Sequence, residues 1–365
     1  MTNNVRILFS ESEKYYRDLG LKDIPSTIYK FDGMRYYNKP TNWLSNNFDL
    51  FVCFMFTLPH NSLITSKFKE SGVPTVFVLD GIYDYANASK NIMNAKYSIS
   101  ILECCQQDIL ISVDYRLEKF FNKKLVHIGY LPKHMLINNS FTEDRDAKSK
   151  ILLTTANSAY FDDEEYNNLL EIINLSLSSF EERGIDYDVR IFDKRIIDDL
   201  DSKYQINNVI DCNFDSVLNK YSHIVTTPSS IAISAMRSNK PVALLLYRNE
   251  PTFISSGWSF LSKNTIDSSL KSFLAIDESR MIYQKRFLSN FEFERDLTSA
   301  ISDSIALDFQ RDRRPSSIEE YSFVNKNYRN MLDSKFNFNF EFFIRNLYLK
   351  IKRNSFVKVI KKIIR

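Results

Sequence analysis

The sequence predicts an α/β protein of two doubly wound domains followed by a helical, basic tail. First, the chain has 365 residues, which is more than one ordinary domain needs. Second, apolar segments of strand length alternate with polar segments of helical length along most of the chain. Third, the polar stretch 138–150 separates two such series and is typical of a linker. Short strands joined by helices form parallel sheets, so each series predicts one sheet.

The first series assigns residues 1–140 to an N-terminal domain. Its apolar runs are short and rich in Val, Ile and Phe, as expected for buried parallel strands. The predicted strands are Val5–Phe9, Phe48–Phe56, Thr75–Leu79, Ile109–Val113 and Leu125–Ile128. The helices predicted between them are 61–71, 86–95 and 115–123.

The second series assigns residues 148–315 to a C-terminal domain, and 316–365 to a helical return and tail. The strands expected here are Ile151–Thr155, Tyr187–Phe192, Asn208–Asp211, His223–Thr226 and Pro241–Tyr247. The helices expected between them are Asp162–Arg183, Phe214–Lys220 and Ser229–Ser238. Ligands of such sheets bind beyond the carboxyl ends of the strands, so we expect a cleft between the two domains.

Composition excludes several classes of protein. Apolar residues make up 44% and charged residues 25%, which is typical of a folded domain. No run of 18 apolar residues is present, and the first residues do not resemble a secretory signal. The four cysteines form no CxxC pair, and no two histidines have metal-ligand spacing. We therefore expect a cytoplasmic protein without a metal or other cofactor.

Charge is concentrated at the C-terminal end. Residues 336–365 carry a net charge of +7, which leaves −4 on the other 335 residues. The body therefore lacks the basic stripe of a nucleic-acid-binding protein. In 356–365, apolar residues occupy one helical face and basic residues the other, and a second apolar face is formed in 342–353. This pattern predicts binding to the anionic inner face of the cell membrane; the alternatives are a helix packed on the protein or a disordered tail. The basic residues expected at the membrane are Lys350, Arg353, Lys358, Lys361, Lys362 and Arg365.

The segment TTPSS at 226–230 lies between a predicted strand and a helix of small residues. Ser229 is a plausible N-cap, and the free N–H groups of a first helical turn favour a bound anion. The pair Ser229-Ser230 therefore indicates a phosphate site, although the same residues could simply cap a core helix.

The segment from Asp188 to Glu250 resembles the nucleotide-sugar half of GT-B glycosyltransferases. In both, an acidic helix is followed by a strand that reaches a Ser/Thr pair, then by a helix and by a strand that begins with "GKPV". Asn239 stands here in place of the usual glycine. The resemblance implies two Rossmann-like domains with a nucleotide-sugar donor held by the second. It also implies that the donor contacts are Thr155, Asn157 and Ser158 in one loop, Thr227, Ser229 and Ser230 at the phosphate, and Glu250 at the ribose or sugar.

Asp80-Gly81 closes the apolar strand 75–79. This resembles the acid-plus-glycine motif of bacterial GT-B transferases that use CMP-activated acidic sugars, the sialyl- and Kdo-transferases of capsule and lipopolysaccharide synthesis. The resemblance implies that Asp80 is the general base that deprotonates the acceptor hydroxyl. His60 is an alternative base and Asp84 a reserve, while Asp80 could instead cap the next helix.

One feature departs from that family. Its members commonly carry a His-Pro pair in the second domain, and this chain has none. Lys194 and Arg195 follow the corresponding strand and could neutralise the donor phosphate instead.

These observations predict an inverting, metal-independent glycosyltransferase at the cytoplasmic membrane surface. Its partners would be a nucleotide sugar, with a CMP-linked acidic sugar favoured, and a cell-surface glycan or lipid-linked saccharide as acceptor. Two alternatives remain open. One is a polyol-phosphate transferase of teichoic-acid type that uses a CDP donor. The other is a GT-B protein that binds a nucleotide sugar or glycan without catalysis.

Overall fold

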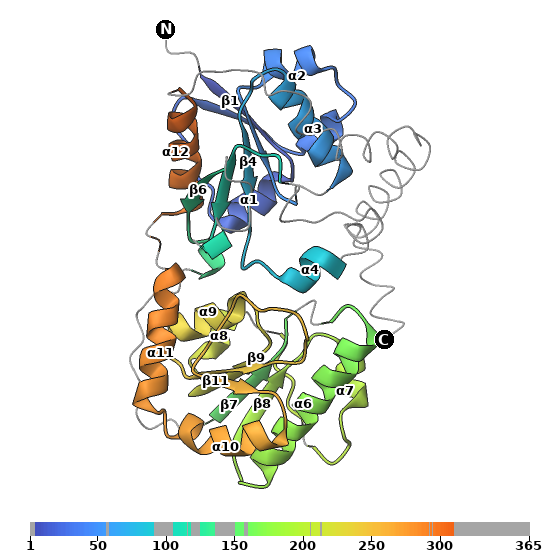
Figure 1. Ribbon diagram of the computed structural model, residues 1–365, viewed down its shortest axis with the longest axis vertical. Helices are drawn as coiled ribbons and strands as arrows, with labels where there is room; N and C mark the ends of the chain where they lie inside the picture. The colour runs from blue at the N-terminus through green and yellow to red at the C-terminus, as the bar shows by residue number, and fades with distance from the viewer. Residues whose placement is uncertain are drawn as a thin grey trace.

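A computed structural model of the chain shows two α/β domains, one above the other in Figure 1. It describes residues 4–55, 58–90, 105–114, 116–117, 125–135, 150–156, 160–204, 206–211, 214–291, 293 and 295–309. Residues 138–149 of the predicted linker 138–150 and the tail 316–365 lie outside these residues, and residue 150 begins a strand.

The first domain is a six-stranded parallel sheet in the order β2-β1-β3-β4-β5-β6. Chain order reverses between β1 and β3, as in other doubly wound sheets. The strands are β1 (Val5–Phe9), β2 (Thr27–Lys30), β3 (Leu50–Cys53), β4 (Thr75–Val78), β5 (Ile109–Ser112) and β6 (Val126–Gly129). The helices are α1 (Glu13–Leu19), α2 (Thr41–Asn47), α3 (Pro59–Glu70) and α4 (Tyr85–Lys90), with 3₁₀ turns at Gly33–Tyr36 and Lys133–Met135.

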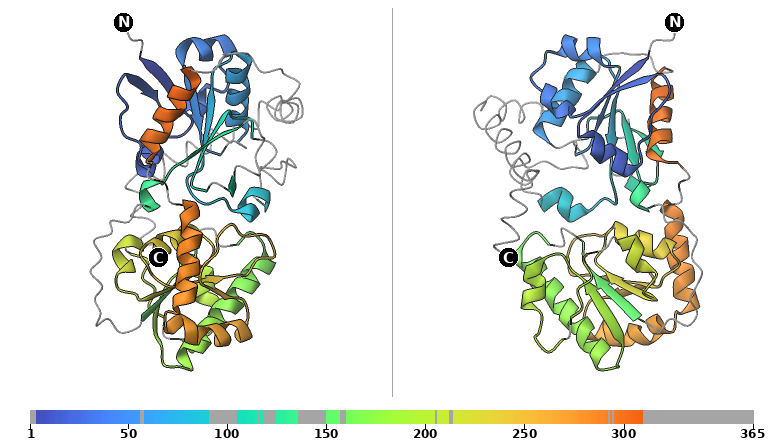
Figure 2. Two further views of the ribbon diagram at one scale, coloured as in Figure 1. Left: turned by 60° about the vertical axis from the view of Figure 1, so that its left-hand side comes forward. Right: turned by 180° about the vertical axis from the view of Figure 1, so that it is seen from behind.

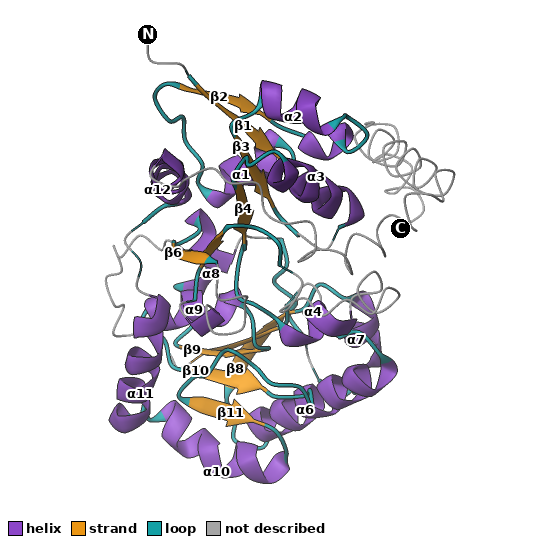
Figure 3. Cartoon of the chain, turned by 45° about the horizontal axis from the view of Figure 1, so that its top comes forward, coloured by secondary structure: helices purple, strands orange, loops and turns teal. Residues whose placement is uncertain are grey.

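The second domain is a five-stranded parallel sheet in the order β11-β10-β9-β7-β8, with its reversal between β7 and β9. Helices cover both faces of this sheet (Figure 3). The strands are β7 (Lys150–Thr154), β8 (Asp186–Arg190), β9 (His223–Thr226), β10 (Val242–Leu245) and β11 (Trp258–Phe260). The helices are α6 (Asp163–Glu181), α7 (Lys194–Asp199), α8 (Phe214–Leu218), α9 (Ser230–Arg237), α10 (Lys263–Leu274) and α11 (Glu278–Leu288), followed by a 3₁₀ turn at Ser289–Phe291.

Helix α6 shows how the sequence specifies these elements. Its N-cap Asp162 accepts a hydrogen bond from the Glu165 N–H at 2.9 Å, and acidic residues fill its first turn. Both features stabilise a helix N-terminus. Leu169, Ile173 and Leu177 recur every four residues and are fully buried, so one stripe of the helix packs on the sheet.

The chain then returns to the first domain through helix α12 (Leu297–Phe309). Figure 2 shows α12 beside the first sheet, although it follows the whole second domain in the sequence. The Lys22 N–H donates to Thr298 Oγ1 at 2.9 Å, and the Leu131 N–H donates to the Arg295 carbonyl at 2.9 Å. Helix α12, which was predicted to belong to the second domain (148–315), therefore packs on the first domain instead.

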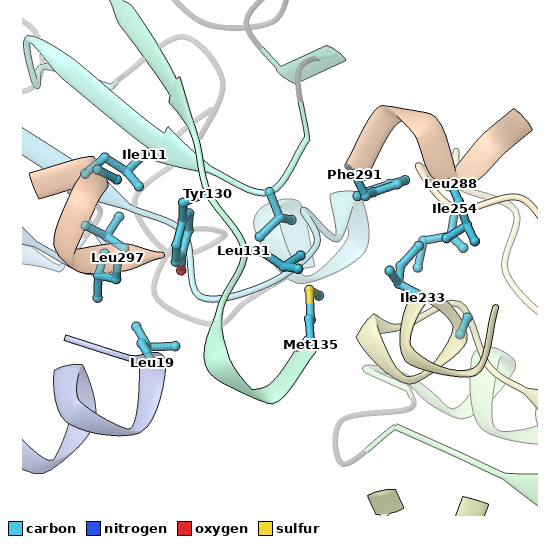
Figure 4. Close-up of a cluster of buried hydrophobic side chains, with 14 of the residues drawn as sticks. Leu19, Ile111, Tyr130, Leu131, Met135, Ile233, Ile254, Leu288, Phe291 and Leu297 are labelled. Atoms are coloured by element: carbon cyan, nitrogen blue, oxygen red, sulfur yellow. The ribbon is translucent and has the colours of Figure 1, made fainter. Parts of the chain in front are cut away.

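A hydrophobic cluster joins the two domains on this side of the molecule. Leu131 and Met135 of the first domain lie toward Ile233 and Phe291 of the second (Figure 4). All four side chains are buried. Fully burying one such side chain contributes about 1.5–3 kcal/mol, so the cluster holds the domains together beside the cleft.

The two-domain α/β architecture is confirmed. Strands β1 and β9 have the predicted bounds, and most of the other predicted strands shorten by one or more residues. The strand expected at Asn208–Asp211 is wrong, because Asn208 forms an isolated bridge to Val189 and no ladder follows. Strands β2 and β11 were not predicted, since each is only three or four residues long and carries polar residues.

Candidate functional site

A cavity of about 440 Å³ lies between the two sheets, where the carboxyl ends of strands from both domains meet. The first domain lines it with residues 80–86, which follow β4. The second domain lines it with residues after β7, β9 and β10. The cavity has the position expected for a ligand site in a protein with this architecture.

Asp80 and Gly81 lie on the wall of the first domain. They follow β4, whose four residues are buried, and the neighbouring Tyr130 hydroxyl donates to the Leu79 carbonyl at 2.6 Å. Burial and then the negative charge of Asp80 raise the pKa of both Tyr15 and Tyr130. Both phenols therefore stay protonated near the Asp80 carboxylate.

Ser229 and Ser230 lie on the opposite wall, where helix α9 begins. Ser229 is the N-cap by backbone conformation, but its side chain makes no capping hydrogen bond. Its Oγ is buried and has no hydrogen-bond partner among the described residues. A buried hydroxyl without a partner is costly, so this atom is available to bind a ligand at the helix N-terminus.

Arg248 and Glu250 form a third wall, just beyond β10. Arg248 crosses between the domains: its Nη1 lies 3.0 Å from Asp84 Oδ2, and its Nε lies 3.1 Å from Glu165 Oε2. Burial lowers the pKa of Arg248, but the nearby Tyr247, Asp84 and Glu165 outweigh it and raise the pKa overall. The guanidinium is therefore a fixed positive charge at the cavity edge.

Lys90 joins the same network from the end of α4. Its Nζ lies within ion-pair distance of three carboxylates of the second domain, those of Asp162, Glu165 and Glu250. Burial lowers the pKa of Lys90, but the hydrogen bonds that its ammonium donates to Glu165, Glu250 and Asp162 outweigh burial and raise the pKa overall. The ammonium therefore stays charged at neutral pH.

Thr155 and Thr227 lie at the point where the second sheet reverses its order, and both are buried. Thr227 Oγ1 accepts a hydrogen bond from the Ala156 N–H at 2.8 Å, which ties the loop after β7 to the end of β9. Ala156 lines the cavity, whereas the two threonines lie behind it. The Thr227 hydroxyl therefore supports the loop after β7, and neither threonine is among the residues that line the cavity.

Three predicted residues lie away from the cavity. His60 is buried in the first turn of α3 and not in a loop, because α3 begins at Pro59. Lys194 is exposed on α7 and pairs with Asp198, four residues further along the same helix. The Arg195 guanidinium stacks on Tyr166 and Tyr160, 3.8 and 4.9 Å from the ring centroids. None of the three is among the residues that line the cavity.

Asn157, Ser158 and the basic residues of the tail lie outside the described residues. Within the described part of the chain, no helix is long and apolar enough to cross a membrane.

Sequence reasoning missed two residues that line the cavity, Tyr247 and Arg248, and it also missed Lys90 beside the cavity. Tyr247 ends the expected strand Pro241–Tyr247 and Arg248 follows it, so the strand-end rule that selected Asp80 could have selected them too. Lys90 carries no such signal, because its partners are 72 to 160 residues away in the chain.

Comparison with known proteins shows similarity of structure but not of sequence. No protein-family model matches the sequence, and no curated protein is significantly similar to it. A putative UDP-N-acetylglucosamine 2-epimerase from Listeria monocytogenes matches 87% of this chain and 100% of its own, with a TM-score of 0.53 and 12% identity. MnaA of S. aureus, solved with UDP, matches 86% and 99%, with a TM-score of 0.52 and 13% identity.

The fold is GT-B-like. The similarity spans both domains and nearly the full length of the solved chains, and both sheets have doubly wound, parallel topology. The calicheamicin glycosyltransferase CalG4 also matches, with 13% identity over 85% of this chain and 99% of its own and a TM-score of 0.49. At these identities the likeness establishes the fold alone.

Proposed function

We propose that this protein is a glycosyltransferase that moves a sugar from a nucleotide-sugar donor to a saccharide acceptor in the interdomain cavity. One observation carries the proposal: Asp80 and the Ser229-Ser230 pair line opposite walls of the same cavity. The serines and the start of α9 would hold the donor phosphate. Asp80, on the facing wall, would take the proton from the acceptor hydroxyl.

The arrangement suits inversion at the anomeric carbon. The acceptor oxygen forms the new glycosidic bond while the bond to the donor phosphate breaks, and the proton passes to Asp80. The phosphate leaves with the bonding electron pair, and the dipole of α9 favours that negative charge. A base and a leaving-group site on opposite walls place attack and departure on opposite faces of the sugar.

The cavity is lined by more acidic than basic side chains. Among the described lining residues Arg248 is the one cation, and it already pairs with Asp84 and Glu165. Asp80, Asp84 and Glu250 add negative charge. A CMP-linked acidic sugar and a UDP-sugar bring the same negative charge, because the carboxylate of the acidic sugar replaces the second phosphate charge. The CMP-linked acidic sugar is therefore proposed from the resemblance at Asp80-Gly81.

A second candidate is epimerisation of a UDP-sugar. It is favoured by the neighbour from Listeria monocytogenes, described as a putative UDP-N-acetylglucosamine 2-epimerase, and by the UDP bound to MnaA of S. aureus. An epimerase needs no acceptor, which separates it experimentally from a transferase.

Product analysis would distinguish these reactions. The protein should be incubated with CMP-sialic acid, CMP-Kdo, UDP-N-acetylglucosamine and CDP-glycerol, each with and without a panel of saccharide acceptors. We expect free nucleotide and a glycosylated acceptor, with inverted anomeric configuration by NMR. Conversion of the UDP-sugar to its epimer without an acceptor would indicate an epimerase. Release of CMP from CDP-glycerol would indicate a polyol-phosphate transferase. Nucleotide sugars that bind but stay intact would indicate a binding protein.

We also propose that the basic tail brings this cavity to acceptors at an anionic membrane surface. The proposal rests on the sequence pattern of residues 336–365. Replacing Lys358, Lys361 and Lys362 by Glu should weaken sedimentation with phosphatidylglycerol vesicles by about 10²-fold, since each basic residue contributes ~1 kcal/mol near such a surface. Equal sedimentation of the wild-type chain with phosphatidylcholine vesicles would contradict the electrostatic part of the proposal.

A further inference from the structure

Lys90 reaches from one domain to the other beside the cavity. It ends α4, which lies between β4 and β5 in the chain and therefore belongs to the first domain (Figure 1). Its Nζ lies 2.7 Å from Glu250 Oε1, 2.7 Å from Glu165 Oε1 and 3.0 Å from Asp162 Oδ2. The side chain of Lys90 is about one-third exposed, while that of Glu165 is 5% exposed. A half-buried cation is thus shared by carboxylates of the other domain.

Glu250 is the member of this cluster that lines the cavity. One carboxylate oxygen, Oε1, is held by Lys90. The other, Oε2, is buried and has no hydrogen-bond partner in the part of the chain that the structure describes. A buried carboxylate oxygen without a donor is costly, so Oε2 is suited to accept hydrogen bonds from a ligand. The hydroxyl groups of a ribose or sugar are donors of the required kind.

Glu165 does not need Lys90 to stay paired. Its second oxygen accepts from Arg248 Nε at 3.1 Å and from the Phe161 N–H at 2.9 Å. Within the described part of the chain, Lys90 is the one cation paired with Glu250. Removing the ammonium should therefore affect the orientation of Glu250 more than the packing of α6.

We propose that Lys90 is a positioning residue for ligand recognition. By holding Oε1 of Glu250, Lys90 turns Oε2 toward the hydroxyl groups of the donor. Because Lys90 and Glu250 belong to different domains, the hydroxyl-binding part of the site is complete only while α4 is docked on the second domain. The inference rests on the proposed function, since it assumes a nucleotide donor in this cavity.

The test compares nucleotides that differ only in their ribose hydroxyls. Dissociation constants would be measured by calorimetry for UDP and CMP and for their 2′,3′-dideoxy counterparts. We expect the wild-type chain to bind one ribonucleotide about tenfold more tightly than its dideoxy form. The dideoxy form lacks the hydroxyl groups that would donate to the charged carboxylate of Glu250, and such a hydrogen bond has about this effect. Lys90→Met should remove this preference by weakening the ribonucleotide alone, and Lys90→Arg should restore much of it. Lys203→Met, at an exposed lysine paired with Asp201, is the matched control.

Glu250→Gln keeps the test decisive if Lys90→Met folds poorly. Glu250→Gln should also lose the preference for the ribonucleotide over its dideoxy form. The double variant Lys90→Met/Glu250→Gln should show the same loss as Glu250→Gln alone. A wild-type preference that survives in Lys90→Met or in Glu250→Gln would overturn the inference, and so would binding of a ribonucleotide without any preference. Absence of binding to either nucleotide would instead overturn the proposed donor site.

Discussion

Asp80→Asn should lower the rate of sugar transfer by about 10²–10⁴-fold, the usual contribution of a general base. The amide cannot take up the proton of the attacking hydroxyl group, but it has nearly the same shape as the carboxylate. Nucleotide affinity should therefore stay close to that of the wild type, because the serines on the opposite wall are intact. Single-turnover rates on the donor identified by product analysis, with nucleotide affinity in parallel, would separate loss of chemistry from loss of binding.

Asp18→Asn is the matched control for this variant. Asp18 is on the exposed face of α1, where it pairs with Lys14, so the same substitution should leave the transfer rate unchanged. A wild-type rate in Asp80→Asn would reject Asp80 as the base. Asp84→Asn would then be the next variant, although Asp84 already pairs with Arg248.

Ser229→Ala/Ser230→Ala should weaken nucleotide binding by about 10²–10⁴-fold. Each hydroxyl would lose one hydrogen bond to a charged phosphate, and such bonds contribute about 1.5–3 kcal/mol. Folding stability should hardly change at Ser229, because its Oγ has no protein partner to lose within the described residues. Thermal unfolding with CMP, UDP, GDP, CDP and ADP checks both points, since a hundredfold excess of ligand over its dissociation constant adds about 2.7 kcal/mol.

Ser268→Ala is the matched control for the double variant, because Ser268 lies exposed on α10. Its nucleotide-induced rise in melting temperature should equal that of the wild type. A rise that persists in Ser229→Ala/Ser230→Ala would move the phosphate site elsewhere in the cavity. No rise in the wild-type chain with any nucleotide would favour a protein that does not use nucleotide sugars.

The two walls of the candidate site were predictable because both depend on local patterns. Asp80 and the serine pair each follow an apolar strand, and carboxyl ends of parallel strands meet at one edge of a sheet. Helix starts such as Asp162 at α6 were predictable for the same reason, since capping acts within one turn. Lys194 has the same kind of local signal, yet it turns outward to Asp198.

The sequence by itself determined the class of fold, the positions of most strands and the residues at the ends of β4 and β9. Hydrophobic periodicity and helix capping act over a few residues, so they can be read along the chain. Tertiary structure alone decided the return of α12, the burial of His60 and the pairing of Lys90 with Glu250. These depend on contacts between residues far apart in the chain, up to 278 positions in the hydrogen bond from Thr298 Oγ1 to the Gly20 carbonyl.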